Sequence, residues 1–260
     1  MARSRARVRI SRAYIDQYSR RIESVNKAAG KAVITESSKR AWAERMAEDR
    51  DFDFEEVARV MAGLCGTYSK LASALTCDFY NGIRDASVLA DGFSAALWDG
   101  YDSDRIRAAA YEIAKGVASG NSTVPLDNLL ENLTNREVKL AADETIRFNT
   151  KRDPKGEKYV IVPSAGACAF CLMRAANGYT YADEEAAESH DHCSCVATPV
   201  FGNAQIEGYD SNEYRDKYDS AKEALAKGDI SDELKGRLES GNYSETSAIL
   251  AVMREQNGIS

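Results

Sequence analysis

The stretch 53-DFEEVARVMAGLCGTYSKLASALTCDFYNGIR-84 carries the strongest structural signal in the chain. Its apolar residues recur every three or four positions, which places them along one face of an α-helix. They are Val57, Val60, Leu64, Tyr68, Leu71, Leu75 and Phe79. Asp53 stands where a helix N-cap is expected, and Glu56 follows three residues later, as in a capping box. The segment therefore predicts a long amphipathic helix that ends near Arg84.

Helical periodicity continues on both sides of this segment. One helix is expected to begin near Ser11, with Gly30 and the polar stretch at 34–40 interrupting it. Another is expected between a cap at 102–104 and Gly120. A third fits 126–149, in one piece or two, and the last fifty residues contain three further helical patterns. Cys65 and Cys77 lie inside the central helix, where cysteine behaves as a small buried apolar residue.

Two short segments read as strands instead. EKYVIVP (157–163) and SCVATPVF (194–201) are rich in β-branched and aromatic residues. The sequence thus predicts a mainly α protein, in which a helical body carries a small β-containing, zinc-stabilised module and a helical C-terminal tail. The expected divisions are a basic arm at 1–12, the helical body at 13–153, the zinc-binding α/β module at 154–204 and the helical tail at 205–260.

Charge is distributed unevenly along the chain. The 260 residues have a net charge of −7, yet the first twelve contain five arginines and no acid. The remaining residues therefore carry −12, which argues against broad binding to duplex DNA. Arg3, Arg5, Arg7 and Arg9 form an arm that could contact nucleic acid or an acidic protein surface, or remain a solvated terminus.

Targeting signals and bilayer-spanning segments are not expected. No apolar run approaches the ~18–20 residues that a membrane crossing needs, and the arginine-rich start lacks the apolar region of a secretory signal. The six cysteines are too few and too clustered for a disulfide scaffold, which favours a reducing compartment.

Four of the six cysteines and both histidines fall within 168-CAFCLMRAANGYTYADEEAAESHDHCSC-195. Cys168 and Cys171 have the spacing of a zinc knuckle, and the HDHCSC end offers further sulfur and imidazole donors. A short helix is expected at 171–178, ended by Gly178. Disulfides would leave the histidines unexplained, and a redox C-x-x-C normally opens a helix in a βαβ unit that this sequence lacks. The cluster therefore predicts structural Zn²⁺.

The ligand set has one secure pair and several alternatives. Cys168 and Cys171 form the pair, and His190 with Cys193 repeats the i, i+3 spacing. Cys195 could replace Cys193, because alternate residues of an extended segment face opposite ways. His192 is a further alternate ligand. Four protein ligands would leave no open position for a catalytic water, so the expected zinc is structural.

The segment 162–201, which contains this cluster, resembles the C-terminal module of MuF-like minor capsid proteins from phages of actinobacteria. The residues that carry the resemblance are Val162, Pro163, Cys168, Phe170, Cys171, Met173, Ala175, Gly178, Tyr181, His190, Cys193, Cys195, Pro199, Val200 and Phe201. Phe79, Tyr80 and Arg84 also match the family's F-Y-D-x-x-R segment, with Asn81 in place of the usual acid.

The resemblance implies a structural virion component that acts near the portal in head assembly or DNA packaging. Its partners would be the portal or major capsid protein, and packaged DNA through the arginine arm. It would occupy the host cytoplasm during assembly and then the virion head, with no membrane contact and no small-molecule substrate.

Two other classes of function compete with this one. A zinc-dependent nucleic-acid-binding module is disfavoured because acids dominate the loop at 172–189. An enzyme or toxin domain is disfavoured because the chain has no G-x-S-x-G, no P-loop and no dinucleotide-binding turn. With both histidines assigned to the cluster, no base remains for a nucleophilic pair. We therefore expect no enzymatic activity.

Overall fold

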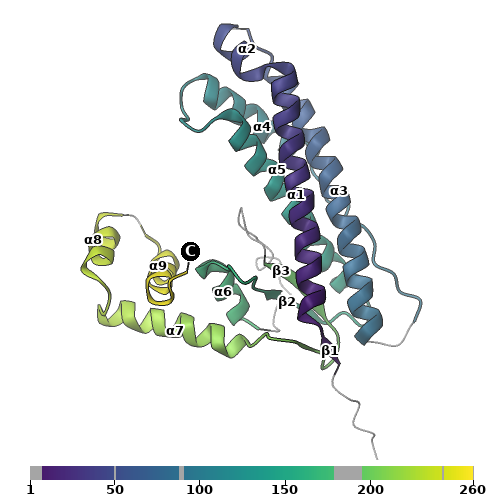
Figure 1. Cartoon of the computed structure of the whole chain (residues 1–260), viewed down its shortest axis with the longest axis vertical. Helices are drawn as coiled ribbons and strands as arrows, with labels where there is room; N and C mark the ends of the chain where they lie inside the picture. Colours follow the sequence, from purple (N-terminus) through teal and green to yellow (C-terminus); the bar gives the residue numbers. More distant parts are fainter. Residues whose placement is uncertain (1–7, 50, 88–90, 179–194, 242, 260) are drawn as a thin grey trace, which may run out of the picture.

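The computed structural model describes residues 8–49, 51–87, 91–178, 195–241 and 243–259. It shows a long helical bundle with a smaller helical lobe beside one end, joined through a short strand pair (Figure 1). Helices dominate the described residues, so the expectation of a mainly α fold is confirmed. None of the helices in these ranges combines the length and the apolar character that a bilayer crossing requires.

The bundle consists of α1 (Arg12–Arg40), α3 (Phe54–Ser87), α4 (Ser103–Ala118) and α5 (Leu126–Arg152), and short α2 (Trp42–Glu48) lies at its far end (Figure 1). Apolar side chains form two clusters along its length. The far cluster surrounds buried Trp42, Met61 and Leu130. The near cluster extends from α1, α3 and α5 onto the strand pair, so bundle and strands share one core.

Helix α1 is continuous, and the interruption expected around Gly30 is wrong. Ser11 precedes the helix as predicted, but α1 runs unbroken to Arg40. Gly30 is buried where α1 meets α5, and a β-carbon there would collide with the Glu131 side chain. The glycine thus marks a close approach of two helices and does not end the helix. Helix α5 likewise forms one piece.

The central helix is confirmed, but its start differs from the prediction. The Asp53 carboxylate accepts a hydrogen bond from the Glu55 amide at 3.0 Å, as an N-terminal cap should. Glu56 does not return a bond to the cap. Its carboxylate is held by Arg40 at 3.2 Å and Arg45 at 2.9 Å. Partial burial acts to raise the Glu56 pKa, but the hydrogen bonds from these two arginines outweigh it and lower the pKa. A tertiary ion-pair network has replaced the local capping box.

Both predicted strands are present. Strand β2 (Lys158–Val162) pairs antiparallel with β3 (Val196–Val200), and Val162 lies opposite Val196. A second, parallel pair joins β1 (Arg9–Ile10) to β4 (Gln205–Ile206), so the chain before α1 is tied to the chain after β3.

The predicted short helix is α6 (Ala169–Ala176), which is followed by Gly178 with φ of +62°. The three expected tail helices are α7 (Ser211–Lys227), α8 (Asp232–Ser240) and α9 (Glu245–Asn257). They form a third apolar cluster together with Ala169 and Leu172 of α6. Helix α6 therefore packs on the strand pair through Cys171 and on the tail through Leu172.

Candidate metal centre

The first knuckle lies at the start of α6. Cys168 occupies the N-cap position with extended backbone (φ −75°, ψ 168°) and is partly exposed, whereas Cys171 in the first turn is 2% exposed. Unsatisfied backbone amides and the helix dipole both favour negative charge at a helix N-terminus. Thiolates at these two positions would be stabilised there, and this agrees with a role as metal ligands.

Cys195 lies immediately before β3. The register of the strand pair brings it opposite the chain that leaves β2, where the Ser164 amide donates a hydrogen bond to the Cys195 sulfur at 3.4 Å. The Cys195 carbonyl accepts a hydrogen bond of 2.6 Å from the Lys139 ammonium of α5, which also pairs with Asp143 at 2.9 Å. These contacts fix Cys195 against the bundle at the end of the strand pair.

The fold thus brings three of the predicted ligands into one region. Cys171 and Cys195 belong to the same buried cluster, and Cys168 packs against it. Across the part of the chain that the structure describes, no three His, Cys, Asp or Glu side chains come together as a metal-holding group. His190, His192 and Cys193 lie outside the described residues.

The residues present are chemically suited to zinc. Thiolate sulfur is a preferred Zn²⁺ ligand, and an amide that donates to sulfur supports a ligand from outside the coordination shell. The three described cysteines could supply sulfur, and at least one further donor would have to come from 179–194. Their position suits a structural ion, because the strand pair has only two strands and such pairs are marginally stable alone.

The other two cysteines have a different character. Cys65 and Cys77 are buried within α3, as expected, with exposed fractions of 0% and 8%. Burial raises the pKa of each thiol to about 11. Both therefore behave as small buried apolar groups, as cysteine commonly does inside a helix.

Of the predicted arginine arm, Arg9 alone falls in the described residues. It is exposed on β1, and the flanking Val8 carbonyl accepts a hydrogen bond of 2.9 Å from the Gln205 amide. The base of the arm is therefore anchored. Arg3, Arg5 and Arg7 lie outside the described residues.

The sequence analysis did not predict a buried ionic centre at Arg84. Its guanidinium donates two hydrogen bonds to Asp153, at 2.6 and 3.0 Å, and one of 2.8 Å to Asp91. The hydroxyl of Tyr80 also donates to Asp153, at 3.2 Å. The side chains of Arg84 and Asp153 are 2% and 0% exposed. The two carboxylates raise the pKa of Arg84, and Arg84 lowers that of Asp91.

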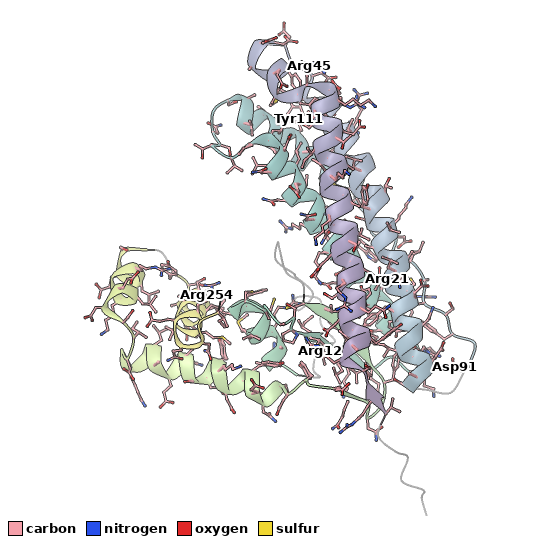
Figure 2. All side chains as sticks on the ribbon, in the orientation of Figure 1. Arg12, Arg21, Arg45, Asp91, Tyr111 and Arg254 are labelled. Atoms are coloured by element: carbon pink, nitrogen blue, oxygen red, sulfur yellow. The ribbon has the colours of Figure 1, made fainter. Side chains whose placement is uncertain are left out.

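This centre anchors the segment that joins α3 to α4. Asp91 opens the described part of that segment (Figure 2). Asn81 accepts a hydrogen bond of 2.9 Å from the Ala95 amide. Asn149 both accepts from the Ala96 amide and donates to its carbonyl, each at 2.8 Å. Tyr80, Asn81 and Arg84 of this F-Y-N-x-x-R segment therefore have structural roles, and the sequence signal for these three residues was their match to a family segment.

These features define a mainly helical protein whose helical bundle carries a cysteine-bearing strand–helix–strand unit. The chain belongs to the VG15 protein family, a phage protein family whose model matches residues 9–221. Neither a curated protein nor a solved structure gives a significant match.

Proposed function

We propose that this phage protein is a minor capsid protein of the MuF-like type. It would act structurally near the portal during head assembly or DNA packaging, and no catalytic step is assigned to it. Its expected partners are the portal or major capsid protein, first in the host cytoplasm and then in the virion head.

One observation carries the proposal. The described residues among those that resemble the MuF-like module lie on one folded unit, β2–α6–β3, or directly beside its elements, in a chain of a phage protein family. Val162 ends β2, Cys168 caps α6 and Cys171 lies in its first turn, and Pro199 and Val200 lie in β3. These matching positions lie on neighbouring elements of one unit, which supports the proposal.

The biological test is deletion of the gene from the phage that encodes it. Heads assembled without the chain should be aberrant or contain little DNA, and a plasmid copy should restore filled particles. Mass spectrometry should find the chain in purified procapsids. Normal yields of filled, infectious particles, with the chain absent from procapsids, would exclude the role.

Structural zinc is the second part of the proposal. Cys168 and Cys171 would provide two ligands, and His190 with Cys193 or Cys195 would complete the set, with His192 as the alternate. A structural zinc ion supplies about 10–16 kcal/mol in peptide systems, enough to hold such a small unit together.

Metal content can be measured independently of assembly. Chain purified under reducing conditions should contain about one equivalent of zinc. The Cys171→Ser variant should lose it, while the matched Cys65→Ser variant should keep it, because Cys65 is a buried thiol of α3. Wild-type chain without metal, with its clustered thiols oxidised in pairs, would refute the zinc site and leave the assembly role to be judged on particles.

A further inference from the structure

The solvent-facing side of α1 has a one-sided charge. Thirteen residues of Arg12–Arg40 are exposed, of which five are basic and none is acidic. The three acids of this helix, Asp16, Glu23 and Glu36, are only partly exposed. Four of the exposed basic residues form what we call the α1 basic face: Arg20, Arg21, Lys27 and Lys31.

The face is an ordered row of charges. At 100° per residue, Arg20, Lys27 and Lys31 lie within about 40° of one another around the helix and span about 16 Å along it. Arg21 lies about 100° from Arg20 around the helix, to one side of this row, on α1 at the front of the bundle (Figure 2).

These charges are not neutralised within the described residues. None of the four forms an ion pair there, whereas Arg12 pairs with Asp16 at 2.9 Å and Arg40 with Glu36 at 3.1 Å. The cations that support the fold and those that face solvent are therefore different sets.

The face contrasts with the remainder of the chain. Residues 1–40 contain eleven basic and three acidic residues, so their net charge of +8 leaves −15 on the other 220. An anionic partner would be attracted to this side and repelled elsewhere, which gives the protein one orientation for binding a polyanion.

Side chains between the cations favour phosphate over a protein partner. Ser24, Ala28 and Thr35 are small and exposed, so they leave the cations accessible. A protein interface needs an apolar core. In the described structure, the large hydrophobic residues that this helix exposes are limited to Tyr14 and Ile34, too few to form such a core. Single-stranded nucleic acid needs aromatic stacking platforms, and the Tyr14 ring already stacks on Phe79 at 5.5 Å.

We propose that the α1 basic face binds the phosphate backbone of double-stranded DNA without sequence preference. The surface is distinct from the arginine arm and from the zinc module. The inference does not depend on the assembly role, because purified chain is sufficient to test it. Four phosphate contacts would give a slope of log Kobs against log[salt] of about −4, and non-specific contacts of this kind reach dissociation constants of about 10⁻⁴–10⁻⁶ M.

The test compares two quadruple variants of the full chain by fluorescence anisotropy, with a mixed-sequence duplex of about 30 base pairs at several salt concentrations. The face variant replaces Arg20, Arg21, Lys27 and Lys31 by Gln. The control variant removes equal charge from exposed positions on α3, α4, α7 and α9: Lys70, Lys115, Lys222 and Arg254 to Gln. Circular dichroism checks that both remain folded.

The face variant should bind DNA at least about tenfold more weakly than the control variant and show a salt slope smaller by about 3–4. The same loss should appear when both variants are made in a chain that lacks residues 2–7, which separates the contribution of the helix from that of the arm. Equal binding by the two variants would overturn the proposal, as would no residual binding in the arm-deleted chain. Tighter binding of polyglutamate than of DNA would identify an acidic protein as the partner and would equally overturn it.

Discussion

At the scale of single residues, the Arg84–Asp153 pair is the most deeply buried ion pair of the described residues. Loss of one member of such a pair leaves an uncompensated buried charge, which typically costs about 3–5 kcal/mol. The exposed Arg59–Asp53 pair, 3.5 Å apart, supplies a matched comparison. Exposed pairs contribute about 0–1 kcal/mol, because water screens them.

Arg84→Met should therefore lower the free energy of unfolding by about 3–5 kcal/mol, because Asp153 would stay buried without its partner. Arg59→Met should change it by less than about 1 kcal/mol. Urea denaturation followed by circular dichroism measures both. Equal costs for the two substitutions would show that the buried pair contributes no more than a surface contact.

A second prediction at this scale concerns alkaline pH. Burial raises the pKa of Cys65 to about 11 in the folded chain, against 9.0 for an unperturbed thiol. As pH rises through 9, the unfolded chain ionises this thiol before the folded chain does, so stability falls. Between pH 8 and 10.5 the loss due to Cys65 should be about 2 kcal/mol.

This loss can be isolated by comparison with Cys65→Ala. Buried tyrosines contribute in the same direction, since desolvation also raises the pKa of Tyr159 to about 12. The variant retains them and lacks only the Cys65 thiol. Its unfolding free energy under reducing conditions should decline less steeply with pH than that of wild type. Parallel pH profiles for the two chains would refute the assignment.

Residues with local roles could be predicted from the sequence, and those with long-range partners could not. Asp53 was predicted as a cap because its partner is two residues away. Glu56 has the same local pattern, but its arginines lie 16 and 11 residues earlier, beyond any cap rule. Asp153 drew no prediction, because its partner Arg84 is 69 positions away. For the metal site, the cysteine spacing in the sequence predicts the ligand pair. The contacts of Cys195 with Ser164 and Lys139 could not be predicted, because they depend on the register of the strand pair.

At the scale of elements, two glycines have opposite roles that can be tested as a pair. Gly178 follows α6 with φ of +62°, and a β-carbon there would lie 3.0 Å from the Ser211 hydroxyl at the start of α7. Gly116 lies inside α4, with nothing within 4 Å of the same position. An alanine at 178 is strained and crowded, whereas at 116 it only improves helix propensity.

Gly178→Ala should lower stability by about 1–2 kcal/mol, since the left-handed conformation disfavours a side chain and the contact between α6 and α7 must shift. Gly116→Ala should raise it by about 0.5–1 kcal/mol. Thermal and urea unfolding provide the measurement. If both substitutions stabilise, Gly178 is not a required helix terminus.

Element boundaries could be predicted where a cap or terminator is local. Asp102 accepts hydrogen bonds from the amides of Asp104 and Arg105, so the predicted start of α4 is confirmed. Gly30 was read as an interruption because glycine lowers helix propensity. Its packing against Glu131 depends on how α1 crosses α5, which periodicity does not specify.

At the scale of the whole molecule, three apolar clusters follow one another. The far bundle cluster contains Leu130, the near bundle cluster extends onto the strands, and the tail cluster contains Leu172. Helix α6 contributes to the last two. Among the described residues, the tail helices α7–α9 therefore meet the strand unit mainly through this short helix, and also through Tyr209, whose ring packs against Tyr214 of α7. Such an arrangement should open in segments, not as one cooperative unit.

Truncating one buried side chain should therefore destabilise only the part of the molecule whose apolar cluster contains it. Leu172→Ala removes a side chain that is 7% exposed, and such truncations cost about 2–5 kcal/mol. Hydrogen exchange should accelerate in α7–α9 and remain near wild type in α1–α5. Leu130→Ala, at a fully buried site in the far bundle cluster, should give the reverse pattern. If either substitution accelerates exchange throughout the chain, the bundle and the tail unfold together and α6 is not the element at which they separate.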